Sequence, residues 1–115
     1  MRLTLIQFAP FVAAWRRLSL TDTDLAALEA QIMESPDAGK VMSGTGGVRK
    51  IRFAPPSWRR GKSGASRVCY VYFSSVAQCY LLTIFTKAQK ANLSAADKAA
   101  IKNLVVQARF AAEQG

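Results

Sequence analysis

The fold is decided by residues 67–86, which read RVCYVYFSSVAQCYLLTIFT. Two runs within this stretch, 67–73 and 78–86, are rich in the β-branched, aromatic and aliphatic residues that favour strands. The four residues between the runs, Ser74 to Ala77, suit the turn of a hairpin. The stretch therefore predicts two antiparallel strands that pair with each other.

Two further strands are predicted N-terminal to this hairpin. Residues 2–8 form a short apolar run that ends before Pro10, which cannot donate a hydrogen bond to a sheet. Residues 48–53 alternate, so that Lys50 and Arg52 share one strand face. Residues 54–66, which contain two prolines and two glycines, predict a long basic loop.

Helices are predicted between and after these strands. Residues 11–18 suit a short helix. Two longer helices begin at acidic capping boxes and continue with apolar residues at helical spacing; the boxes are Thr21 with Asp24 and Ser94 with Asp97. The element order is therefore β-α-α-β-β-β-α. This order predicts one α+β domain over residues 1–115, an antiparallel sheet of about four strands with helices packed on one face.

The charge of the chain is concentrated in its middle. The 115 residues carry 16 basic and 7 acidic side chains, a net charge of +9. No acidic residue lies between Ala38 and Ala96, whereas this segment contains ten cations: Lys40, Arg49, Lys50, Arg52, Arg59, Arg60, Lys62, Arg67, Lys87 and Lys90. Cations placed for solubility alone are usually mixed with carboxylates. The segment therefore indicates a polyanionic partner, and a phosphate backbone is the usual one.

The composition excludes several kinds of active site. There is no histidine, which excludes His-based acid–base catalysis, Ser-His and Cys-His nucleophiles and ordinary zinc sites. A two-metal nuclease centre would need carboxylates that the middle segment lacks. We expect no metal and no cofactor, so cleavage of RNA by this sheet would depend on lysine and arginine, with tyrosine as a further candidate. The two cysteines, Cys69 and Cys79, lie in apolar runs and predict buried free thiols in a reducing cytoplasm.

Three further segments are distinctive: 44–54 (GTGGVRKIRFA), 62–70 (KSGASRVCY) and 81–87 (LLTIFTK). Together they resemble the HigB-type toxins of the RelE/ParE superfamily of type II toxin–antitoxin systems. The match runs in one colinear order over nearly the whole chain. It implies a small sheet backed by helices, whose open basic face receives an mRNA codon in the ribosomal A site.

The resemblance implies a metal-independent endoribonuclease, an mRNA interferase that inhibits translation. The implied partners are the ribosome with its rRNA and mRNA, and a cognate antitoxin, a small helix-turn-helix protein through which alone the pair would contact operator DNA. No membrane partner is expected.

The same resemblance implies the catalytic residues. Lys50, Arg52, Arg67 and Lys87 lie on the matching strand segments. The implied reaction is attack of a ribose 2′-OH on the adjacent phosphate, which leaves a cyclic phosphate and a free 5′-OH. Arg52 and Arg67 would stabilise the transition state, since a guanidinium fork suits a phosphorane. Lys50, beside these two arginines, is the candidate general base.

Other cations are implied to bind RNA, and one role is left open. The RNA-binding candidates are Lys40, Trp58, Arg59, Arg60, Lys62 and Lys90; Trp58 suits base stacking and packing of the loop equally well. Some RelE-type toxins carry a tyrosine shortly after the last strand, and residues 88–94 contain none. The acid for the leaving group is therefore open among Lys87, Lys90 and the ribosome.

Two alternative functions remain. A ParE-like toxin of the same superfamily inhibits DNA gyrase without cleaving nucleic acid, although such toxins generally lack the full set of sheet cations found here. A nucleic-acid-binding module of phage origin is the other alternative.

Overall fold

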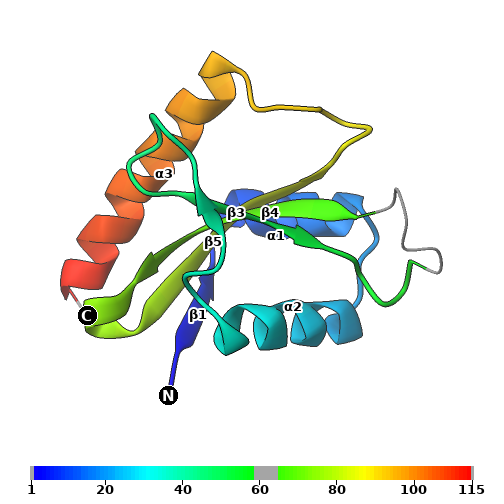
Figure 1. Ribbon diagram of the computed structural model, residues 1–115, viewed down its shortest axis with the longest axis horizontal. Helices are drawn as coiled ribbons and strands as arrows, with labels where there is room; N and C mark the ends of the chain where they lie inside the picture. Colours follow the sequence, from blue (N-terminus) through cyan, green and yellow to red (C-terminus); the bar gives the residue numbers. More distant parts are fainter. Residues whose placement is uncertain (1, 59–64, 115) are drawn as a thin grey trace.

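The computed structural model describes residues 2–58 and 65–114. In this part of the chain the sheet has five strands. Its strands lie in the order β1-β5-β4-β3-β2 (Figure 1), with the bounds β1 Thr4–Gln7, β2 Lys40–Val41, β3 Arg49–Phe53, β4 Ser66–Phe73 and β5 Gln78–Thr86. The predicted hairpin is confirmed, because β4 pairs antiparallel with β5 across a 3-10 turn at Ser74–Val76.

The sheet differs from the prediction in its two edge strands. β2 is only two residues long, too short to show a sequence pattern, and it pairs antiparallel with β3. β1 pairs with β5 in parallel, with Thr4 opposite Gln78 and Gln7 opposite Leu81. The sheet is therefore mixed and five-stranded, whereas the sequence predicted about four antiparallel strands. The α+β class is confirmed.

Helices cover both faces of this sheet, which corrects the prediction that they pack on one face. α1 (Ala9–Arg17) and α2 (Asp22–Glu34) cover one face, and α3 (Ala95–Gln114) covers the other; Figure 1 shows α2 and α3 on opposite sides of the sheet. The reason lies in β4 and β5, which are apolar on both faces. Val68 and Tyr70 are buried with α1 and α2, whereas Cys69 and Val71 are buried with α3. We call the second surface of the sheet the α3 face.

The loop between β2 and β3 is a turn that glycine makes possible. Gly46 and Gly47 have φ angles of 83° and 108°, a region that disfavours side chains. The Thr45 hydroxyl, fully buried, donates to Met42 O (2.6 Å) and accepts from Val48 N (3.1 Å). The turn directs β3 back along β2 and so sets which β3 residues lie on the α3 face.

Asp24 joins the start of α2 to the loop that follows β3. Its carboxylate accepts hydrogen bonds from Thr21 N (2.9 Å), Ser57 N (2.9 Å) and Ser57 Oγ (2.6 Å), which confirms the predicted capping box and adds a tertiary contact. Burial raises the pKa of Asp24, but these hydrogen bonds together outweigh it and hold the pKa below its ordinary value of 3.8. Asp24 therefore stabilises the fold as a carboxylate.

We expect Asp24→Asn to lower the free energy of unfolding by about 1–3 kcal/mol at neutral pH, since it leaves buried partners of a charged group unsatisfied. The folded-state pKa lies below the unfolded value, so the stabilisation is complete above pH 3.8 and is lost as pH falls through the folded pKa. Urea unfolding of both proteins at pH 7 and at pH 3 measures it. The control is Asp97→Asn, which removes the same box from the exposed start of α3 and should cost less. Equal losses in the two variants would contradict the special role of Asp24.

Within the described residues, no helix has the length and apolar character needed to cross a bilayer.

Candidate active site

The register of β3 and β4 brings three cations to one end of the α3 face. Arg52 lies directly opposite Arg67, and Lys50 lies opposite Cys69, which is buried under α3. Because paired residues share a face and residues two apart share a face, Lys50, Arg52 and Arg67 all lie on the α3 face. Strand alternation predicted this arrangement for Lys50 and Arg52. We call these three side chains the cationic triad.

The triad is compact enough for one phosphate. Opposed Cα atoms in an antiparallel pair are roughly 4.5–5.5 Å apart, and residues i and i+2 along a strand are about 7 Å apart. Lysine and arginine side chains can span such separations to reach a common ligand. Arg52 is exposed and Lys50 and Arg67 are half-buried, so all three are accessible to a ligand.

Like charges face each other twice in this sheet. Arg52 is opposite Arg67, and Lys40 of β2 is opposite Lys50. Directly opposed like charges destabilise a sheet. In the described part of the chain, the one ion pair joins Lys90 to Asp97, so no carboxylate neutralises these four cations there. The arrangement is unfavourable for the free protein and favourable for binding an anion.

Arg49 lies on the opposite face of β3 and has a structural role. Its Nη1 donates to Asp37 O (2.8 Å) and to Gly39 O (2.7 Å). Tyr70, opposite Arg49, donates to Pro36 O (2.7 Å) and accepts from Gly39 N (3.3 Å). Burial raises the pKa of Tyr70, which keeps its hydroxyl protonated as a donor. These bonds fix the segment between α2 and β2 against the sheet.

A cavity of about 540 Å³ adjoins the triad at the β2 edge of the α3 face. Its lining residues are Lys40, Val41, Met42, Ser43, Lys50, Asn92, Leu93 and Lys98. Three lysines contribute to this lining, and no carboxylate does. Lys98, Ser43 and Asn92 were not among the residues that the sequence suggested, because these distant parts of the chain come together only where residues 92–98 meet β2 and Lys50 in the folded protein. We call this space the lysine cavity.

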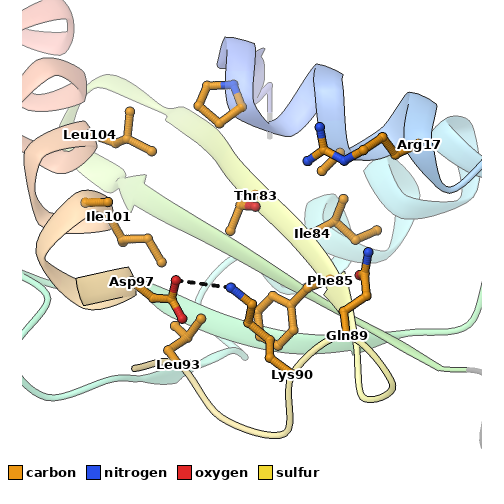
Figure 2. A pocket seen from close by; sticks show the side chains of 13 residues that line it. Arg17, Thr83, Ile84, Phe85, Gln89, Lys90, Leu93, Asp97, Ile101 and Leu104 are labelled. Atoms are coloured by element: carbon orange, nitrogen blue, oxygen red, sulfur yellow. Dashed lines mark hydrogen bonds and ion pairs between the residues drawn. The ribbon is translucent and has the colours of Figure 1, made fainter. Parts of the chain in front are cut away.

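Lys90 lies in a different cavity, of about 420 Å³, between α1, β5 and α3. Figure 2 shows Lys90 and Asp97 pointing toward each other at one side of it, and their Nζ and Oδ1 atoms are 3.1 Å apart. Thr83, Ile84 and Phe85 of β5 line the same cavity, as Figure 2 shows. The charge of Lys90, which the sequence suggested as an RNA ligand, is thus paired with a carboxylate. Lys87 is exposed in the turn after β5, two residues beyond Phe85, the partner of Arg67.

The remaining candidates belong to the loop after β3. Trp58 is half-buried, and its backbone N–H donates to Pro55 O (3.0 Å), next to the contact between Ser57 and Asp24. Arg59, Arg60 and Lys62 lie outside the described residues.

The cysteines are free and buried, as the sequence predicted. Burial raises the pKa of Cys69 and of Cys79 to about 12, and for Cys69 the nearby charge of Lys50 offsets part of that rise. Both groups are therefore thiols at neutral pH and poor nucleophiles. Neither cysteine contributes to the chemistry of this site.

Known protein-family profiles give no match to the chain. Solved structures do. A double arginine-to-alanine variant of the E. coli toxin RelE in the free state has a TM-score of 0.53 at 19% sequence identity, over 79% of this chain and 90% of RelE. A chain of the intact E. coli RelBE toxin–antitoxin complex has a TM-score of 0.51 at 18% identity, over 74% of this chain and 96% of that one. The chain has the RelE fold. At this level of identity the similarity concerns the fold, and the function must be argued from the site.

Proposed function

We propose that this protein is the toxin of a type II toxin–antitoxin pair, of the HigB-like kind, and that it cleaves mRNA in the A site of the ribosome. One observation carries the proposal: on a RelE fold, Lys50, Arg52 and Arg67 share an accessible sheet face on which the described residues provide no carboxylate partner. The segment 38–96 adds the electrostatic attraction for RNA, since it contains no acidic residue.

The triad has the functional groups for transesterification of RNA. The 2′-oxygen attacks the adjacent phosphorus while Lys50, acting as the neutral amine, accepts its proton; the bond from phosphorus to the 5′-oxygen breaks, and a 2′,3′-cyclic phosphate remains. Arg52 and Arg67 donate hydrogen bonds to the phosphorane oxygens, where negative charge increases. The departing 5′-oxygen must gain a proton. Lys87 is the better donor among the candidates, because the ammonium of Lys90 is engaged by Asp97.

Two kinds of partner follow from this proposal. The ribosome would supply the mRNA and hold the codon against the α3 face. A cognate antitoxin, such as a small helix-turn-helix protein, would protect the host cell; the E. coli RelBE complex is an example of a RelE-fold toxin bound by an antitoxin. An acidic or helix-rich antitoxin segment over the cationic triad would block RNA, and opposite charge would speed its association.

The direct test is controlled expression in bacteria, followed by primer extension on several abundant mRNAs. We expect growth arrest within minutes, together with cuts that keep a fixed position within the codon and depend on translation. A DNA-damage response without mRNA cuts would instead indicate a gyrase inhibitor, and neither effect would indicate a binding module. Either of these last two outcomes would refute the proposed nuclease.

A further inference from the structure

We propose that the lysine cavity is a binding site for one ribonucleotide, the neighbour of the scissile phosphate, with its phosphate on Lys40 and Lys98 and with Lys50 at the border between the cavity and the cationic triad. That the ligand is RNA rests on the proposed function. That the cavity binds a phosphate rests on the residues that line it.

The three lysines converge from separate elements. Lys40 and Lys50 are directly opposed on β2 and β3, and Lys98 reaches the same cavity from the first turn of α3. Each position is unfavourable without an anion. Opposed like charges destabilise a strand pair, and a cation near a helix N-terminus opposes the helix dipole. A bound phosphate would reverse the sign of both effects.

The comparison with the other cavity strengthens this argument. There, the cation Lys90 is matched by Asp97, 3.1 Å away. Asp97 and Lys98 are neighbours in sequence at the start of α3, yet they line different cavities. The carboxylate of Asp97 thus lies on the side of α3 that faces Lys90. No carboxylate is among the residues that line the lysine cavity.

The remaining lining suits more than a bare phosphate. A cavity of about 540 Å³ is in the size range of small-molecule sites, well above what one phosphate occupies. Met42 and Leu93, which both pack against the core under α3, offer apolar surface against which a base can pack. The amide of Asn92 can both donate to and accept from a base edge, so it can distinguish one base from another.

Lys50 connects the lysine cavity to the proposed site of cleavage. It belongs both to the cationic triad and to the lining of the cavity. A nucleotide held there would be connected directly to the phosphate at Arg52 and Arg67. The cavity would therefore fix the register of the RNA at the site of cleavage, and Asn92 would contribute to the sequence preference of the cuts.

The test uses the isolated protein at low salt, titrated with the four ribonucleoside 3′-monophosphates and followed by NMR. We expect shifts in the backbone amide signals around Asn92 and Lys98. Lys98→Ala should weaken binding about tenfold, which corresponds to the loss of one charge-assisted contact. The matched control is Lys102→Ala, which removes the same charge one turn further along α3, outside the cavity lining. It should change the affinity less than about twofold. Asn92→Ala should reduce the difference in affinity among the four bases.

Equal weakening by Lys98→Ala and Lys102→Ala would overturn the inference, as would inorganic phosphate binding as tightly as the nucleotides. The result is separable from the proposed function. A protein that cuts mRNA but fails this titration remains a nuclease without this nucleotide site. A protein that binds nucleotides through Lys98 but makes no cuts retains the site and refutes the nuclease.

Discussion

Cleavage of mRNA by the variant Arg52→Ala/Arg67→Ala should fall below detection, and each single variant should lose about 10²–10³-fold in rate. The reason is that each guanidinium stabilises charge that develops in the transition state, and loss of one such donor typically has this effect. The two losses need not multiply, because both side chains act on the same phosphate. The measurement is the rate of cleavage of a ribosome-bound mRNA with purified protein.

The control removes the same charge elsewhere. Arg16 and Arg17 are exposed at the end of α1, which packs on the face opposite the triad. Arg16→Ala/Arg17→Ala should retain the cleavage rate within about threefold, an order-of-magnitude allowance for weaker long-range attraction to RNA. If this control variant were as inactive as Arg52→Ala/Arg67→Ala, the net positive charge of the protein rather than the cationic triad would explain the activity.

Thermal unfolding of the same variants separates loss of the site from loss of the fold. Arg52 and Arg67 face each other and repel, so the variant Arg52→Ala/Arg67→Ala should be at least as stable as the wild type. A site that weakens the fold it belongs to is common in enzymes. A large drop in melting temperature for Arg52→Ala/Arg67→Ala would show that these side chains stabilise the sheet and would remove the main argument for their role in binding.

Affinity for single-stranded RNA should fall about 10²-fold when the salt concentration rises from 50 to 200 mM. Five described cations line the α3 face and its cavity: Lys40, Lys50, Arg52, Arg67 and Lys98. About five phosphate contacts give a log–log slope near −3.5 for single strands and near −4.5 for a duplex. Fluorescence anisotropy with a short labelled RNA, measured over this salt range, gives the slope.

The variants then identify the cations responsible. Arg52→Ala/Arg67→Ala should make the slope less steep by about 1.4, because two counterion-releasing contacts are lost. Arg16→Ala/Arg17→Ala should leave the slope unchanged. A slope near zero for the wild type would mean that the basic segment does not bind phosphates.

The sequence was sufficient to predict the central strands, the starts of two helices and the shared face of two of the three triad residues. The β-prone runs predicted β4 and β5, the capping boxes predicted where α2 and α3 begin, and alternation predicted that Lys50 and Arg52 lie together. These features depend on residues near each other in the chain. Local patterns are enough to reveal them.

The rest of the architecture depends on which distant segments meet. The two residues of β2 carry no periodicity, and their pairing with β3 comes from the glycine turn at 44–47. The need for helices on both faces could have been inferred from the apolar character of both sides of β4 and β5. The sequence of a strand does not reveal which helix covers which face. Lys98 could not be assigned to the site because α3 follows 94 residues of chain. The position of Lys98 in the first turn of α3, where a cation is unfavourable, was the local indication of a nearby anion.

The parallel pairing of β1 with β5 also affects when the protein becomes complete during synthesis. Thr4 to Gln7 find their sheet partners only at Gln78 to Leu81, so more than 70 residues separate the two halves of this contact. Closing so long a loop is slow relative to forming a hairpin, because its entropic cost precedes the gain from pairing. The chain must therefore emerge from the ribosome as far as Leu81, in the first half of β5, before β1 can pair, and α3, with Lys98, follows later still. If the proposed activity is correct, a nascent chain can act on a ribosome only after both β5 and α3 have emerged from its own.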